Sequence, residues 1–305
     1  MTRRVAVTGS HGFIGTNLCE TLGARGDDII RIARPFDPDR LVDALRGADA
    51  VVHLAGLVSA LRDEDYQAAN VDATRAVSAA AARSGVRMVH ISSLAAAGPA
   101  AVSAPRSEDD PPVPITPYGR SKLEGERVVG ATPGLRWTIL RPTIVYGPGD
   151  RALLPLFRFA AGGIMPLVGR RTAAYMFVHV NDLVAVIDRA IDAGLHGEIL
   201  FVAHERPATA CALLDAIAAA VGRRALTLPV PDALLRAAAR TGDLVGRLRG
   251  QRALIDSQRY RELDAEGFVC RVDRLRDRLG IPAGIALPEG LAQTAAWYRT
   301  EGWLR

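Results

Sequence analysis

The sequence has few cysteines and no long apolar run. Cys19, Cys211 and Cys270 lie far apart among 305 residues and form no CxxC pair. This spacing excludes a disulfide framework and a zinc site of the usual kind, and it favours a reducing, cytoplasmic location. No stretch of about 18 consecutive apolar residues occurs, so no membrane-spanning helix is predicted. The acidic and histidine residues show no spacing that suggests any other metal site.

Lysine is nearly absent, because only Lys122 stands among 38 basic residues and the other 37 are arginine. The net charge is +5, and the segment 236–261 alone carries an equal excess. That segment holds seven arginines against Asp243 and Asp256, namely Arg236, Arg240, Arg247, Arg249, Arg252, Arg259 and Arg261. A solvated helix face, an acidic substrate and nucleic acid are all compatible with such a segment. Because it lacks interleaved aromatic residues and any known nucleic-acid motif, nucleic acid is not the predicted partner.

Composition and periodicity indicate a packed α/β protein. Hydrophobic residues make up 49% of the chain and charged residues 23%, which excludes a disordered or collagen-like protein. Short apolar strands alternate with helical segments through the first half. Strands are expected at 3–8, 28–33, 50–54, 87–92, 137–140, 174–180 and 198–202, and helices at 13–22, 41–46, 66–84, 117–130, 153–163, 181–193 and 208–221. This alternation predicts a doubly wound parallel sheet of the Rossmann kind.

Two parts of the chain are expected to have separate tasks. Residues 1–150 are predicted to form a dinucleotide-binding Rossmann domain, to which residues 176–204 return. Residues 151–305, where the alternation loosens, are predicted to form a smaller α/β substrate-binding region.

A glycine-rich turn follows the first predicted strand. Residues 8–15 read TGSHGFIG, with Gly9, Gly12 and Gly15 three apart. Such glycines allow a sharp turn, let backbone N–H groups approach a pyrophosphate, and let the helix pack closely on the strand. The spacing differs from the GxGxxG fingerprint, so the turn by itself is also compatible with an ordinary strand-to-helix turn.

Two further patterns lie near predicted strand and helix ends. Tyr118 and Lys122 form a YxxxK pattern, which places them one helical turn apart on one face of a helix. The helix is expected to begin with Thr116 as its cap and Pro117 at the first helical position. Ser93 ends the strand at 87–92, at the sheet edge where open α/β proteins bind ligands. The only lysine of the chain therefore lies one helical turn from Tyr118. Lysine and arginine are not interchangeable where a compact point charge must fit beside a small group.

Together these patterns resemble the extended short-chain dehydrogenase/reductase family, of the NAD-dependent epimerase/dehydratase type. The resemblance is nearest to the hydroxysteroid-dehydrogenase and dihydroflavonol-reductase branch. It extends over nearly the whole chain, through TGSHGFIG (8–15), AVVHLAG (50–56), Asn70-Val71 at the start of the fourth helix, ISSLAAAG (91–98), YGRSK (118–122), RPTIVYGPGD (141–150) and FVHVNDL (177–183).

The resemblance implies a role for particular residues. Tyr118 matches the catalytic acid/base, Lys122 its partner that also binds the nicotinamide ribose, and Ser93 the catalytic hydroxyl. Other positions match the family's cofactor contacts: Gly9, Gly12, Phe13, Ile14 and Gly15 at the pyrophosphate, Leu54, Ala55 and Gly56 beside the adenosine half, and Pro142, Thr143, Ile144 and Val145 beside the nicotinamide. Lys122, together with the cationic ring of the oxidised nicotinamide, is expected to lower the pKa of Tyr118 from near 10 towards neutrality.

The expected function is an NAD(P)-dependent oxidoreductase that exchanges hydride with a secondary alcohol or ketone carbon. A nucleotide-sugar epimerase with tightly bound NAD is the alternative, and a dinucleotide-sensing protein without catalysis is a remote one. Leu94 and Ala95 follow Ser93, where a 4,6-dehydratase would carry an Asp-Glu pair. Ala95, Ala96 and Ala97 favour an apolar ketone or alcohol over a sugar.

The preferred nicotinamide is expected to be NADP. An NAD site places a carboxylate about 20 residues after the glycines to hold the ribose 2′-hydroxyl. That position falls at Ala33 and Arg34, and Arg34 offers a guanidinium to a 2′-phosphate. Arg31 is expected to face away. The small residues of 66–84, with the tyrosine-bearing helix, suggest a homodimer.

Overall fold

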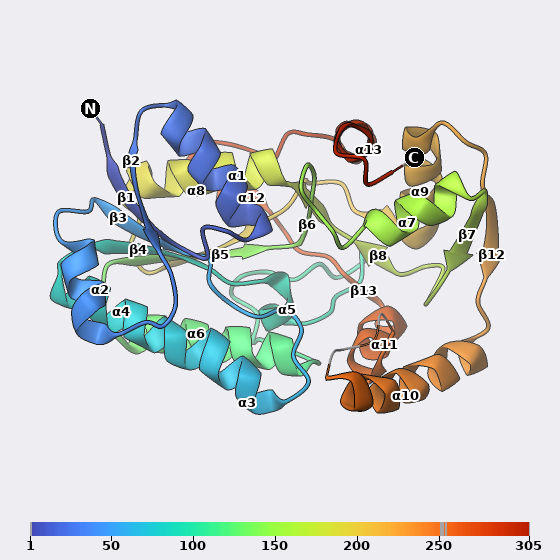
Figure 1. Ribbon diagram of the computed structural model, residues 1–305, viewed down its shortest axis with the longest axis horizontal. Coiled ribbons are helices and arrows are strands. Elements are labelled where there is room, and N and C mark those ends of the chain that lie inside the picture. Colours follow the sequence, from blue (N-terminus) through green and yellow to red (C-terminus); the bar gives the residue numbers. More distant parts are fainter. Residues whose placement is uncertain (1, 251–252, 254, 305) are drawn as a thin grey trace.

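In the computed structural model, which describes residues 2–250, 253 and 255–304, strands and helices alternate along the chain (Figure 1). The strands are β1 (Arg4–Thr8), β2 (Asp28–Ile32), β3 (Ala50–His53), β4 (Arg87–Ile91), β5 (Trp137–Pro142), β6 (Ile144–Tyr146), β7 (Ile164–Leu167), β8 (Ala174–Tyr175), β9 (Phe177–His179), β10 (Glu198–Val202), β11 (Ala208–Thr209), β12 (Leu226–Pro229) and β13 (Gly267–Phe268). The helices are α1 (Phe13–Ala24), α2 (Pro38–Leu45), α3 (Asp63–Tyr66), the π-helix η1 (Gln67–Asp72), α4 (Ala73–Arg83), α5 (Leu94–Ala97), α6 (Pro117–Ala131), α7 (Leu154–Ala161), α8 (Val180–Ala193), α9 (Ala210–Val221), α10 (Asp232–Arg249), α11 (Ser257–Asp264), α12 (Asp273–Leu279) and α13 (Leu287–Thr300).

The central sheet is the predicted doubly wound parallel sheet. Its six strands run in the order β2-β1-β3-β4-β5-β10, and every neighbouring pair is parallel. The chain moves outward from β1 to β2 and then returns across β1 to β3. The connections reverse direction at this point, and open α/β sheets bind ligands in the crevice that such a reversal leaves beyond the carboxyl ends of the strands.

Helices cover both faces of this sheet (Figure 1). Val5 and Val7 of β1 pack with α1, α8 and α12 on one face, whereas Ala6 between them packs with α2, α4 and α6 on the other. All three side chains have no exposed surface. Successive side chains of a strand point to opposite faces of the sheet. Because both faces of β1 are buried, successive residues of its sequence are apolar.

Most predicted elements are present, and the differences have local causes. The predicted helix 66–84 is divided by η1, whose i→i+5 hydrogen bonds insert one extra residue per turn. The predicted strand 174–180 is two short strands, β8 and β9, and Val180 already begins α8 because the His179 ring accepts from Asn181 N–H as a cap. The Arg-rich segment forms most of α10 and α11.

The remaining elements pack around a second apolar cluster. It includes Phe157 of α7, Ile217 of α9 and Tyr298 of α13, all fully buried. β10 belongs to the central sheet, whereas the division into residues 1–150 with 176–204 and residues 151–305 stays a prediction. In the described part of the chain, no helix is long and apolar enough to cross a membrane.

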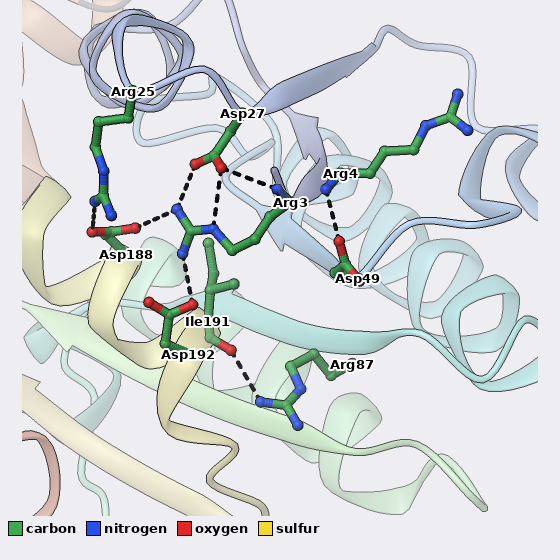
Figure 2. Close-up of polar contacts among 9 residues, drawn as sticks. All are labelled: Arg3, Arg4, Arg25, Asp27, Asp49, Arg87, Asp188, Ile191 and Asp192. Atoms are coloured by element: carbon green, nitrogen blue, oxygen red, sulfur yellow. Dashed lines mark hydrogen bonds and ion pairs between the residues drawn. The ribbon is translucent and has the colours of Figure 1, made fainter. Parts of the chain in front are cut away.

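A charged cluster ties the first strand to α8 (Figure 2). The Arg3 guanidinium contacts Asp27 at 2.5 Å, Asp188 at 2.7 Å and Asp192 at 2.8 Å, and Arg25 also pairs with Asp188. These carboxylates raise the pKa of Arg3 above its already high value. The cluster joins residues far apart in sequence at the amino end of the sheet, opposite the candidate site.

A buried ion pair joins α6 to β5. Glu126 and Arg141 are each only 4% exposed, and two parallel contacts of 2.9 and 2.6 Å connect them. Ser92 Oγ–H also donates to Glu126, and the Arg141 guanidinium lies over the Phe201 ring. A bidentate geometry of this kind offsets the desolvation of both charges.

We predict that Glu126→Gln lowers the free energy of unfolding by about 3–5 kcal/mol, because it leaves the Arg141 charge buried and unpaired. Glu126→Gln/Arg141→Met removes both charges of the pair while Gln still accepts from Ser92. It should restore part of that loss, because Lys122 still lacks the Glu126 counter-charge. Urea denaturation measures both variants. The control is Arg127→Gln, which breaks the exposed Arg127–Glu124 pair on the same helix and should cost less than about 1 kcal/mol. Equal losses in Glu126→Gln and the control would contradict the prediction.

Candidate active site

The predicted site residues gather at the carboxyl edge of the central sheet. Gly9 follows β1, Leu54 follows β3, Ser93 follows β4 and Thr143 follows β5. Because all four strands are parallel, their carboxyl ends meet at one edge. The reversal between β1 and β3 brings the glycine turn beside Leu54, Ala55 and Gly56.

The glycine turn has no room for side chains at two positions. Gly9 has a φ of +72°, and a Cβ there would lie 2.8 Å from Ala55 N. A Cβ on Gly15 would lie 2.2 Å from Gly9 O. Thr16 N makes the first helical hydrogen bond of α1, to Gly12 O, and no acidic residue lies in the first turn. The preceding amides of Phe13 and Ile14 are therefore oriented as a helix N-terminus that accepts a phosphate group.

Tyr118 and Ser93 lie together beside this turn. Thr116 caps α6 by accepting from Gly119 N–H, as the sequence predicts, and Tyr118 lies in the first turn. Its hydroxyl shares a hydrogen bond with Ser93, which by itself lowers the pKa of Tyr118. Burial is the larger effect, and with the nearby Glu262 carboxylate it raises the pKa to about 12. In the protein alone, desolvation thus outweighs the stabilisation of the phenolate, and the lower pKa expected beside Lys122 and an oxidised nicotinamide stays a prediction.

Lys122 is buried one turn farther along α6. Its ammonium donates to the Ile91 carbonyl, at the end of β4, at 2.7 Å. Burial lowers its pKa to about 8, and the Glu126 carboxylate opposes that shift. Lys122 therefore keeps its proton at neutral pH and loses it in mildly alkaline solution. A Cβ on Gly56 would lie 3.9 Å from its Nζ, so the lysine also faces the turn after β3.

Asn70 is a residue of this site that belongs to the resemblance but to which the sequence assigns no role. It lies in η1 and is 1% exposed. Its side chain accepts from Leu57 N–H at 2.7 Å and donates to Leu57 O at 2.9 Å and to Ser121 Oγ at 2.8 Å. Ser121 in turn donates to Tyr118 O. Asn70 thus connects the loop after β3 to the helix that carries Tyr118 and Lys122. No side-chain pattern in the sequence predicts that Asn70 lies in a π turn.

The other predicted cofactor contacts lie along the same edge. Pro142 is buried at the end of β5, Ile144 is 39% exposed, and Val145 is partly buried in β6. At the end of β2, the Arg34 guanidinium donates to Ala69 O at 3.1 Å and lies over the Phe36 ring. Arg31 does not face away, because its guanidinium reaches Ser10 O of the glycine turn at 3.5 Å.

Two hollows flank this arrangement. Arg34 lines a groove of about 520 Å³ with Leu57, Ala69 and neighbouring residues of the loop after β3. A second groove of about 510 Å³ lies beyond Ser93 and Tyr118, between Pro99, Ala100 and Ile115 on one side and Arg170 and residues 260–266 on the other. α11 closes over the tyrosine, since Tyr66 packs its ring 6.4 Å from that of Tyr118 and hydrogen-bonds Gln258.

The described residues contain no group of three or more His, Cys, Asp or Glu side chains that could hold a metal ion. A glycine turn at the point where a parallel sheet reverses, with serine, tyrosine and lysine at the same edge, defines a dinucleotide-dependent enzyme of the oxidoreductase class. The family model for the NAD dependent epimerase/dehydratase family matches residues 5–203. The chain belongs to this family of extended short-chain dehydrogenases/reductases.

Individual relatives resemble nearly the whole chain. Ceramide reductase of Caulobacter vibrioides is 28% identical over 98% of this chain and 96% of its own. Sterol demethylase protein B of Methylococcus capsulatus is 30% identical over 98% of this chain and 99% of its own. The solved structure of MoeE5 in complex with UDP-glucuronic acid and NAD has a TM-score of 0.78 and 27% identity, covering 98% of this chain and 99% of that one.

We predict that Asn70→Ala lowers the free energy of unfolding by about 1–3 kcal/mol, because buried groups of Leu57 and Ser121 lose their partner. Dinucleotide affinity should also fall, since Leu57 follows directly on Leu54–Gly56. The control is Gln67→Ala in the same π-helix, an exposed residue that pairs with Asp72. It should change the unfolding free energy by less than about 0.5 kcal/mol. Denaturation and cofactor titration check the prediction, which is wrong if both variants behave alike.

Proposed function

We propose that the protein is an NADP(H)-dependent reductase of an apolar ketone, with Tyr118 as proton donor and Ser93 as a second hydrogen-bond donor to the substrate oxygen. Bound nicotinamide would supply the hydride that converts the ketone carbon to a secondary alcohol. The glycine turn would hold the pyrophosphate. Leu54, Ala55, Gly56, Pro142, Ile144 and Val145 would line the two ends of the dinucleotide, and Lys122 would bind the nicotinamide ribose.

The contact between Tyr118 and Ser93 carries this proposal, because it places two hydroxyl groups where both can donate to one substrate oxygen. The phenol is neutral at physiological pH, as an ordinary tyrosine with a pKa near 10 is. A neutral phenol beside Ser93 can donate to a carbonyl oxygen as negative charge develops there.

The surroundings of Ser93 agree with an apolar substrate. Leu94 and Ala95 follow it, so no acidic pair is available for dehydratase chemistry. Ala96 and Ala97 are buried, Ala97 in a small core cluster, which leaves Ala95 as the alanine able to face a ligand. Pro99, Ala100 and Ile115 extend this apolar lining along the groove. Ceramide and sterol, named for the two relatives above, are likewise apolar molecules.

A nucleotide-sugar epimerase with tightly bound NAD is the second candidate. Arg170 and Arg261 on the far wall of the same groove favour it, since guanidinium groups bind diphosphates well. Arg170 already pairs with Asp264 at 3.5 Å, which reduces its availability.

We predict that Tyr118→Phe lowers kcat for NADPH-dependent ketone reduction by about 10²–10⁴-fold, the usual contribution of a positioned proton donor. NADPH affinity and the far-UV circular dichroism spectrum should be unchanged, because only one hydroxyl is removed. Steady-state kinetics on a series of apolar ketones makes the measurement. Full activity in Tyr118→Phe would exclude this mechanism.

Mass spectrometry of the purified protein separates the two candidate functions. A reductase exchanges its cofactor and should release it during purification. Stoichiometric retained NAD, together with interconversion of UDP-sugars and no ketone reduction, would replace the reductase by the epimerase.

The choice of NADP follows from the end of β2. No carboxylate stands at Ala33 or Arg34 to accept from a ribose 2′-hydroxyl. Instead, Arg34 lines a groove with Leu57 and Ala69, and Arg31 reaches Ser10 O of the glycine turn. Two guanidinium groups at this rim supply the donors that a 2′-phosphate needs.

We predict that the wild type prefers NADPH over NADH, and that Arg34→Ala reduces the preference about tenfold to a hundredfold, the effect of one charge-assisted hydrogen bond. Fluorescence titration with both cofactors gives the ratio of affinities. Arg40→Ala, an exposed arginine on the neighbouring α2, is the control and should leave the ratio unchanged. A wild type that prefers NADH, or a ratio unaffected by Arg34→Ala, rules out this anchor.

We also propose that the protein forms a homodimer through α4 and α6, as the small residues of this region suggest. Of its alanines, Ala69, Ala73, Ala80 and Ala81 are buried within the chain itself. Ala68, Ala76 and Ala79 remain at or near the outer surface, and they would allow close approach of a second copy.

A further inference from the structure

α10 presents an apolar stripe to solvent. Leu234, Leu244 and Leu248 are 62%, 59% and 79% exposed. At 3.6 residues per turn they fall within an arc of roughly 80° on the helix surface. Figure 1 shows α10 at the lower right edge of the molecule, beside α11. Three exposed leucines on one helix face exceed the scattered apolar residues of an ordinary surface.

The opposite face of α10 packs against the rest of the protein, so a rotation of the helix would not bury the three leucines. Leu235 and Ala239 are buried, and a Cβ on Gly242 would lie 2.0 Å from Ile255 O. Asp243 accepts from Ser257 N–H at 3.1 Å, and Tyr260 donates to Asp232 at 2.9 Å. These contacts hold α10 against α11 and fix the leucines outward.

Arginines border the stripe on both sides. By helical position, Arg240 lies next to Leu244, and Arg249 lies beyond Leu234 on the other side. The two acidic residues of the helix, Asp232 and Asp243, are farther from the stripe and are engaged by Arg236, Tyr260 and Ser257. The outward half of α10 is therefore apolar at its centre and cationic at its edges.

This charge pattern disfavours a second copy of α10 as the occupant. The leucine spacing would suit a coiled-coil seam, in which residues beside the seam form interhelical ion pairs. Here Arg240 lies beside the seam, and Ala238 and Val245 occupy the other flank. Self-pairing would place arginine near arginine with no carboxylate between them.

We propose that α10 docks the protein on an anionic lipid bilayer. The leucines would insert at the boundary of headgroups and acyl chains while the flanking arginines contact lipid phosphates, as in interfacial amphipathic helices. β12, which leads into α10, exposes Leu226 and Leu228 at 64% and 45% and adds apolar surface at its start. The docking is independent of the proposed reductase activity.

The test is cosedimentation of the full chain with vesicles of equimolar phosphatidylglycerol and phosphatidylcholine, compared with phosphatidylcholine alone. The wild type should bind the anionic vesicles preferentially, and less so as salt is raised. Leu244→Asp/Leu248→Asp should lower binding at least about tenfold. Arg240→Gln/Arg249→Gln should lower it about fivefold for each arginine removed.

The control is Val102→Asp, which introduces the same charge at a 56% exposed apolar residue outside α10, and it should bind as the wild type does. Circular dichroism and cofactor affinity establish that each variant is folded. Equal binding to both vesicle types, or binding unaffected by the leucine substitutions, overturns the proposal. Light scattering that shows a dimer dissociated by Leu244→Asp/Leu248→Asp, without vesicle binding, would assign the stripe to a second copy.

Discussion

The buried ammonium of Lys122 is the constraint around which the candidate site is arranged. A lysine that is only 6% exposed loses its hydration, and an uncompensated charge of this kind would release its proton. The Ile91 carbonyl replaces part of the lost water, and Glu126, one turn along the same helix, supplies a counter-charge. Glu126 is itself buried and needs Arg141 and Ser92. Burial of Lys122 therefore requires a connected set of groups from α6, β4 and β5. The same contacts hold α6 in place and with it Tyr118, which lies one turn before Lys122.

Much of the fold and of the site could be predicted from the sequence because the informative residues are close together along the chain. A buried strand, a glycine turn and an amphipathic helix follow one another within residues 4–24, and Tyr118 and Lys122 share one helix. The cap at Thr116 was predicted correctly for the same reason. Parallel strands then bring these short patterns to one edge, since the direction of the strands alone determines where their carboxyl ends lie.

What could not be predicted depends on contacts between distant residues. Asn70 contributes through a π turn whose extra residue rotates it towards Leu57 and Ser121. The partners of Glu126 are 34 and 15 residues away. α11 reaches Tyr118 from more than a hundred residues farther along the chain, and helical periodicity carries no information about that contact. The orientation of Arg31 was wrong for a related reason, because a long side chain at a strand end can bend over the turn irrespective of strand alternation.

The position of Tyr118 and its pKa have to be inferred separately. Sequence spacing places Lys122 near Tyr118, and a positive charge alone would lower the phenol pKa. In the structure the ammonium is directed at Ile91 O, whereas Glu262 and Tyr66 add to the effect of burial on the tyrosine. Burial and the Glu262 carboxylate of α11 therefore oppose the effect expected from Lys122. Sequence spacing gives the position of the tyrosine on its helix, whereas its pKa in the protein depends on groups that distant parts of the chain bring to it.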